Sequence, residues 1–357
     1  MAPDISFDLA FIWAAVIAAA VFLYVCMDGF DLGLGILFPV VDGKADRDVM
    51  VKSVAPVWDG NETWLVLGGG GLLAVFPLAY AVIMPALYMP VILMLLALVF
   101  RGVSFEMRFR AETAGGQRWW DRAFSWGSYV AALCQGIMLG ALVQGIRVQN
   151  RAYAGGWWDW LTPFSAFTGV AVVIGYGRLG ACWLIWRTEG HLQAEARRFA
   201  RGLALATLGC IGLTSAIMPF LQPAFRERWF TWPNILYASP VPILVALLAV
   251  CLFVSLARAD RRAHSGETDE QRGRLSHDGV PFLCALGLFL LSYAGLGISM
   301  WPTIVPPSIK IWEASAARSS QLFLLVGAAV LIPTILAYTA YVYWLFRGKV
   351  RADAGYH

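Results

Sequence analysis

Four acidic residues near the start of the chain have the type and spacing that proton transfer requires. Asp28 and Asp31 follow the first apolar stretch, and Asp59 and Glu62 stand just before the second. Within each pair the residues are three positions apart, so both carboxylates can share one face if a helix continues through them. Carboxylates at a bilayer boundary are costly to keep, and groups that share a partly dehydrated site can pass protons near neutral pH. The pattern favours a proton function, with helix capping or salt bridging at the boundary as the alternative.

The composition assigns the chain to the membrane. Hydrophobic residues make up 59% of the 357 positions and charged residues only 14%. Charge-free runs recur at the length of about 20 residues that a helix needs to cross a bilayer core about 30 Å thick. No stretch resembles a soluble domain, so we expect an all-α integral membrane protein.

Nine membrane-spanning helices are predicted from these runs. We place a turn at Phe76 and Pro77, because the charge-free run across that point is too long for one crossing. The first run is interpreted as a retained helix rather than a signal peptide, because residues 1–8 contain no Lys or Arg. The expected spans are 8–27 (extending to about 38), 56–76, 78–100, 123–146, 162–186, 203–222, 236–257, 279–301 and 320–346.

The distribution of lysine and arginine predicts the orientation. Counted over alternate connections, 20 basic residues lie on one side of the membrane and 6 on the other. Basic connections stay in the cytoplasm, so we expect the N-terminus outside and the C-terminus inside. The polar connection 258–278 is then a cytoplasmic loop, and the net charge of +4 reflects topology rather than a nucleic-acid surface. The four acids fall at the cytoplasmic ends of the first two spans, and Glu106 lies on the same side after the third.

An arginine and two glycine pairs stand out within the predicted spans. Arg178 lies midway through the fifth span, where an arginine must face the bundle interior, water or a partner. An internal ion pair and a ligand role are both open for it. Glycines four positions apart, at 29 and 33 and again at 136 and 140, predict close helix packing.

The histidines and cysteines argue against a metal centre in this chain. All four histidines fall outside the predicted spans, whereas haem iron in a membrane bundle usually takes an axial histidine. The chain alone is therefore a poor haem ligand. The six cysteines lie in apolar segments without a Cys-x-x-Cys pair, which indicates buried thiols rather than disulfides or a zinc site.

Several motifs resemble those of a known family. The chain contains Asp28-Gly-Phe-Asp31-Leu-Gly-Leu-Gly35, Ala55-Pro-x-Trp58-Asp59-Gly60-Asn61-x-x-Trp64 and Phe100-Arg101-Gly-Val-x-Phe105-Glu106-x-Arg108, then Thr162-Pro163-Phe164, Arg187-Thr188-Glu189-Gly190 and Trp301-Pro302. These motifs resemble subunit II of cytochrome bd-type quinol oxidases, and the resemblance covers nearly the whole chain.

The resemblance implies a bacterial inner-membrane complex that oxidises quinol and reduces O2 to water. Haem b, haem d and the quinol site would lie on a partner, subunit I, and this chain would carry no haem. The implied fold is two four-helix bundles plus a peripheral helix, which we assign to residues 1–150, 151–310 and 311–357. Small single-helix accessory subunits and a structurally bound quinone or lipid are left open. The short connection between the first two spans and Arg-Gly at 101–102 resemble the cyanide-insensitive branch.

The resemblance also implies roles for individual residues. Asp59 and Glu106 match a proposed proton route from the cytoplasm along the subunit interface, although Glu106 stands where a relative has Asp. We assign Asp59, Glu106, Asp28, Asp31 and Glu62 to proton delivery, and Trp58, Arg101 and Asp121 to support of the partner's haem region, a role that the resemblance implies for Asp31 too. A proton-coupled secondary transporter is the alternative function, and a scaffold without a proton role is the third interpretation.

Overall fold

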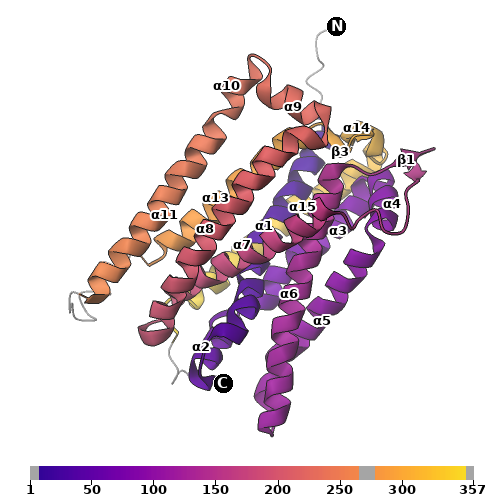
Figure 1. Ribbon diagram of the computed structural model, residues 1–357. Helices are drawn as coiled ribbons and strands as arrows, with labels where there is room; N and C mark the ends of the chain where they lie inside the picture. The colour runs from indigo at the N-terminus through magenta and orange to yellow at the C-terminus, as the bar shows by residue number, and fades with distance from the viewer. Residues whose placement is uncertain (1–7, 265–277, 351–357) are drawn as a thin grey trace.

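The computed structural model describes residues 8–264 and 278–350, and its long elements are all helices (Figure 1). The helices are α1 (Leu9–Leu37), α2 (Lys44–Val54), α3 (Trp58–Val75), α4 (Pro77–Ala86), α5 (Tyr88–Arg110), α6 (Ala114–Gln144), α7 (Pro163–Arg187), α8 (Gly190–Leu221), α9 (Pro223–Phe230), α10 (Asn234–Ala238), α11 (Pro240–His264), α13 (Val280–Met300), α14 (Ile311–Ala314) and α15 (Arg318–Leu345). A 3-10 turn, η1 (Phe38–Val40), follows α1. Two antiparallel hairpins pair β1 (Val148–Gln149) with β2 (Ala152–Tyr153) and β3 (Thr303–Val305) with β4 (Ile309–Lys310).

The membrane class predicted from composition is confirmed. Within the described residues, eight helices are long and apolar enough to cross a bilayer: α1, α5, α6, α7, α8, the segment containing α10 and α11, α13 and α15. Helix α3, expected as the second span, is not among them. It has only 18 residues, and its first turns carry Asp59, Asn61 and Glu62.

The third predicted span differs in detail from the structure. The chain does turn at Phe76 and Pro77, as predicted, but the expected single helix 78–100 is divided at Leu87 into α4 and α5. Pro90 explains the division. A proline inside a helix has no N–H to donate, and its ring clashes with the carbonyl four residues earlier, here that of Ala86. Helix α5 then runs on to Arg110 and carries Arg101 and Glu106 within a helix rather than after one.

Helix α1 continues without a break through both of its acids, as the sequence suggested. A side chain at Gly33 would collide with the Tyr176 carbonyl oxygen and with the Gly180 amide nitrogen of α7, so the backbones of α1 and α7 are in direct contact. Gly136 and Gly140 of α6 approach α7 in the same way, against Thr168 and the backbone at Ser165. Both glycine pairs therefore serve close helix packing, as predicted. Helix α7 is the centre of the fold, and it is the most buried of the spanning helices.

The connections are sorted to the two ends of the bundle. Figure 1 shows α2 at one end, while both hairpins, α9 and α14 lie at the other. Helices α5 and α11 form opposite flanks of the bundle. Of the connection 258–278, residues 265–277 lie outside the described residues, as do residues 351–357 of the predicted tail.

Candidate functional site

A buried ion pair joins α1 to α5 at the centre of the predicted acid cluster. Arg101 donates from Nη1 to Asp28 Oδ1 at 2.5 Å, and both side chains are fully buried. Nη2 of the same guanidinium donates to Glu62 Oε2 at 3.3 Å. Glu62 retains 27% of its side-chain exposure, so it is the member of this group nearest to solvent. Arg101 therefore ties three helices together, because α1, α3 and α5 each contribute one of the three charges.

The second acid of α1 is held by an amide instead of a cation. Asn61 donates from Nδ2 to Asp31 Oδ2 at 2.8 Å, and its own Oδ1 accepts from the Tyr343 hydroxyl at 2.8 Å. Asp31 and Asn61 are both buried, and Asp31 Oδ1 has no hydrogen-bond partner among the described residues. The acid pair of α1 thus has two different environments, one ionic and one polar. This difference follows from its partners on α3, α5 and α15.

Two of these partners were missed by the sequence analysis. Asn61 belongs to the second quoted motif, so the motif was a signal for it, but no role was assigned. Nothing in the sequence indicated a role for Tyr343, because aromatic residues near the end of a spanning helix are common at membrane boundaries. It lies 282 positions from Asn61 in the chain.

Asp59 and Trp58 occupy the first turn of α3. The Asp59 side chain is exposed, while Trp58 is half-buried and stacks on Phe105 of α5 with ring centroids 4.8 Å apart. Val57 is the N-cap of α3, and no side chain caps this helix. The Asp59 side chain therefore does not cap α3, which was the alternative considered for it. Asp59 stands one turn before Glu62, on the solvent side of the ion pair.

Glu106 and Asp121 lie away from the cluster. Glu106 pairs with Arg110 on the exposed face of α5, and its side chain is 63% exposed. Asp121 of α6 accepts from Arg108 Nε at 2.6 Å, and the same arginine reaches Asp48 of α2 at 2.6 Å. Asp121 thus belongs to a second ionic group that fastens α2 to α5 and α6. The structure brings Asp28, Asp31 and Glu62 together around Arg101 and leaves Glu106 and Asp121 outside.

Arg178 does not form the internal ion pair considered for it. Its guanidinium is buried, donates from Nη2 to the Ala285 carbonyl at 3.2 Å, and lies 5.4 Å from the centre of the Phe289 ring. No carboxylate pairs with it among residues 8–264 and 278–350, and it lines a large cavity. Its role is therefore separate from that of the acid cluster.

The histidine nearest to this region has a local partner. His191 lies in the first turn of α8 rather than in a loop, and its exposed ring is 3.1 Å from Asp46 of α2. His277 and His357 lie outside the described residues. The described residues contain no cluster of three His, Cys, Asp or Glu side chains that could hold a metal ion. The described part of the cluster consists of acids, which can hold and exchange protons, and of an amide, a phenol and an arginine, which hydrogen-bond within it; none of these offers iron an imidazole.

Comparison with known proteins places this geometry in a family. A sequence profile of the family described as cytochrome bd terminal oxidase subunit II matches residues 9–346. The chain is 30% identical to cytochrome bd-I ubiquinol oxidase subunit 2 of Escherichia coli K12, over 97% of this chain and 96% of that protein. It is 25% identical to cytochrome bd ubiquinol oxidase subunit 2 of Bacillus subtilis 168, over 96% of each chain.

A solved structure shares the fold. The bd oxidase of Geobacillus thermodenitrificans contains a chain that superposes with a TM-score of 0.71, with 95% of this chain and 99% of that chain covered. The sequence identity in that superposition is 17%, so the match describes the arrangement of helices alone.

Proposed function

The chain belongs to the cytochrome bd terminal oxidase subunit II family, and from this premise we propose that it works with a haem-bearing subunit I to oxidise quinol and reduce O2 to water. The full-length match to relatives named ubiquinol oxidase subunit 2 supports this proposal. The chain is a multi-pass protein of the bacterial inner membrane. The comparisons give no support to the transporter alternative.

We assign the redox cofactors to the partner. When bound, haems b and d would supply electron transfer and O2 binding. The described residues of this chain do not fit a haem, because the histidine of a candidate span, His191, is an exposed side chain engaged with Asp46 at the end of α8. The contribution of this chain is then to hold subunit I in place and to handle protons. The proposal extends to small single-helix accessory subunits, for which the exposed apolar faces of α11 and α15 offer room.

The proposed membrane arrangement has nine crossings, with the N-terminus outside and the C-terminus inside. Helix α3 would be the ninth, since its 18 residues rise about 27 Å, close to the thickness of a bilayer core of about 30 Å. The distribution of basic residues, 20 against 6, supports the orientation. The hairpins at 148–153 and 303–310 support boundaries near residues 150 and 310, between two four-helix bundles and a last helix.

The proposed role of the acid cluster is to take up protons from the cytoplasm for O2 reduction. The observation that carries it is the burial of Asp28 and Asp31 directly behind Glu62, which is itself partly exposed and one turn from Asp59. One guanidinium pairs with Asp28 and Glu62, while the buried Asp31 is held by Asn61, so the cluster has three acids and one cation. Because the acids outnumber the cations, one carboxyl group of the cluster can hold a proton. Asp59 would receive protons from water, and Glu62 would pass them to the buried pair.

Glu106 provides a second proposed element of the route. It lies on an exposed face of α5, away from the cluster. We propose that this face meets subunit I and that Glu106 acts there. Trp58, Arg101 and Asp121 would keep the adjoining helices in register against the partner's haem region, through the stacking on Phe105 and the two ionic groups.

The test is the substitution Asp59→Asn in the assembled complex. An amide cannot accept and release a proton near neutral pH, so we expect O2 consumption per haem to fall by about 10²-fold if no water bypasses the step. The haem spectrum serves to confirm that the complex is intact. If Asp59 only favours the N-terminal dipole of α3, the loss is about 0.3 to 1 kcal/mol of stability with unchanged turnover.

A control variant and a second test variant accompany Asp59→Asn. Asp42→Asn removes another exposed acid, in the loop between η1 and α2, and should leave turnover unchanged. Glu106→Gln tests the second element, since a fall in turnover with normal haem content supports a role at the interface. Native turnover of Asp59→Asn at full haem content would reject proton uptake through this residue.

A further inference from the structure

Two cysteines meet between α11 and α13. Cys251 lies midway along α11 and Cys284 in the second turn of α13, and their thiols are close enough to hydrogen-bond. Both cysteines are free, and Cys251 is exposed on the outside of the bundle whereas Cys284 is buried. The surrounding lipid therefore has access to one residue of the pair and not to the other.

The packing of the two helices brings these cysteines together. A Cβ added at Gly287 would lie 2.8 Å from Leu248 Cδ1, so α11 approaches α13 closely at that level. Leu248 stands three residues before Cys251, and Gly287 stands three residues after Cys284. Three residues are close to one helical turn, so in two antiparallel helices the same faces meet again one turn further on. The contact between the two thiols therefore follows from the register of the helices.

A buried cation lies next to the pair. Arg178 of α7 donates from Nη2 to the carbonyl of Ala285, the residue that follows Cys284, at 3.2 Å. Its charge acts on the thiols of Cys284 and of Cys182, which lies one turn further along α7. The thiolate is the nucleophile in disulfide chemistry, and a neighbouring arginine favours it. Arg178 can thus supply the counter-charge when Cys284 reacts.

We propose that Cys251 and Cys284 form a redox-active pair, which an organic hydroperoxide dissolved in the bilayer oxidises to a disulfide. The Cys251 sulfur attacks the peroxide, the O–O bond breaks, and a sulfenic acid and an alcohol result. The Cys284 thiolate then attacks the sulfenic sulfur, the S–S bond forms, and the hydroxide that leaves takes up the proton of the Cys284 thiol as water. Two electrons pass from the two sulfurs to the peroxide, and a dithiol reductant returns them.

The disulfide would fasten α11 to the bundle, because α11 contacts the other helices mainly through α13. It would close a loop that includes the connection 258–278. This inference concerns thiol chemistry and does not depend on the proton role of the acid cluster.

The test treats the purified complex with cumene hydroperoxide and maps its peptides by mass spectrometry. Trypsin can cut after Arg258 and Arg261, between the two cysteines, so a disulfide appears as two joined peptides. We expect this joined product, and we expect dithiothreitol to separate it. Oxidation of Cys251 without joining, or a bond between Cys182 and Cys284, would overturn the assignment.

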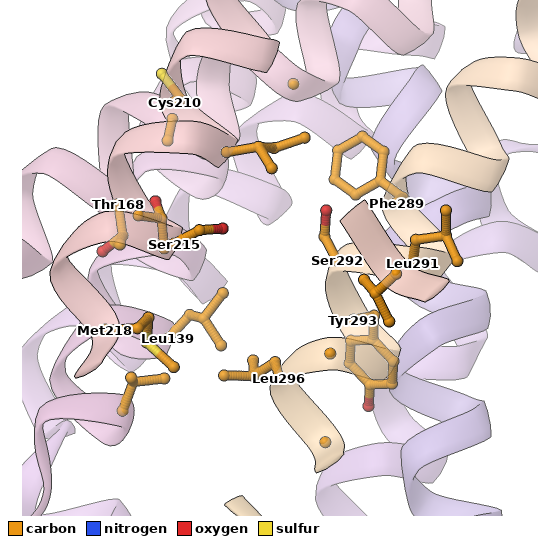
Figure 2. A pocket seen from close by; sticks show the side chains of 18 of the residues that line it. Leu139, Thr168, Cys210, Ser215, Met218, Phe289, Leu291, Ser292, Tyr293 and Leu296 are labelled. Atoms are coloured by element: carbon orange, nitrogen blue, oxygen red, sulfur yellow. The ribbon is translucent and has the colours of Figure 1, made fainter. Parts of the chain in front are cut away.

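Serine variants test the order of the two steps. Cys284→Ser should abolish the joined product and leave Cys251 as a sulfenic acid that dimedone labels, whereas Cys251→Ser should prevent both. Cys210→Ser is the control, because Cys210 of α8 faces Phe289 and Ser292 of α13 across the cavity rather than a second thiol (Figure 2). It should form the disulfide as the native complex does. Dimedone labelling at Cys284 in Cys251→Ser would reverse the order and overturn the role of Cys251.

Arg178→Gln tests the counter-charge. It should slow disulfide formation at least tenfold, whereas Arg178→Lys, which keeps the charge, should retain most of the rate. The haem spectrum confirms that each variant complex is intact. A native rate in Arg178→Gln would show that Arg178 does not assist the reaction.

Discussion

The pair of Asp28 and Arg101 should be a main source of stability between α1 and α5, and Asp28→Asn tests this. The substitution keeps the shape of the side chain but leaves Arg101 buried without its nearest counter-charge. Removing one partner of a buried pair costs about 3 to 5 kcal/mol. Here Glu62 still faces the guanidinium at 3.3 Å, and asparagine still offers an acceptor oxygen. We therefore expect the lower end, about 3 kcal/mol, or roughly a 150-fold shift in the unfolding equilibrium.

A double-mutant cycle isolates the pair itself. Arg101→Gln alone leaves Asp28 buried without its cation, and it should also be strongly destabilising. The double variant removes both charges of this pair and leaves Glu62 without Arg101, as Arg101→Gln alone does, so its loss should be smaller than the sum of the two single losses, by about 1 to 3 kcal/mol. Unfolding of the purified complex, followed by tryptophan fluorescence and haem absorbance, measures all three variants.

The exposed pair of Arg147 and Asp159 provides the control. It has the same chemistry, but the Arg147 side chain is 71% exposed, and exposed pairs are worth about 0.2 to 1 kcal/mol. Arg147→Gln should therefore change stability very little. If Asp28→Asn costs no more than Arg147→Gln, or if the double variant is strictly additive, the buried pair does not hold the helices together.

Two further predictions concern the surroundings of the cluster. Tyr343→Phe removes the hydroxyl that donates to Asn61, which frees the Asn61 amide to turn away from Asp31. The pH profile of O2 consumption should then shift while haem content stays normal. An unchanged profile would mean that Asn61 needs no hydrogen bond from α15. Gly33→Ala should severely lower the yield of assembled complex, because the added carbon meets the backbone of α7. Gly209 of α8 has open space around it, so Gly209→Ala should assemble normally. Equal yields of the two variants would contradict the close packing of α1 on α7.

Much of the membrane architecture follows from the sequence, because charge-free runs are long and repeated. The turn at Phe76 was predicted for this reason, and the extension of α1 to Leu37 was predicted although it contains Asp28 and Asp31. The break at Leu87 was missed although Pro90 is visible in the sequence, since proline in spanning helices is often tolerated. Helix α3 falls below the hydropathy of the other spans, because Asp59, Asn61 and Glu62 lower the apolar character of its first turns.

The contacts of the cluster were harder to predict than its members. Arg101 and Asp28 are 73 positions apart, and only the packing of α1 and α5 against α6 decides that they pair. The separation of Arg101 and Glu106 could be predicted from the sequence. Five residues along a helix correspond to a rotation of about 140° beyond one turn, so the two side chains point in different directions. Arg108, seven residues on, returns to within about 20° of Arg101, and it too is buried.

Tyr343 and Asn61 are joined across 282 positions of the chain. A ribosome makes the chain from its N-terminus at about 5 to 20 residues per second, so Asn61 exists roughly 15 to 60 s before Tyr343 does. During that interval α1 and α3 can already be in the bilayer, with Asp31 held by an amide that has no donor from α15. The last helix to be synthesised completes the hydrogen bonding of the first. A nascent chain that stops before α15 would therefore carry its acids into the membrane without the side chain that closes their network.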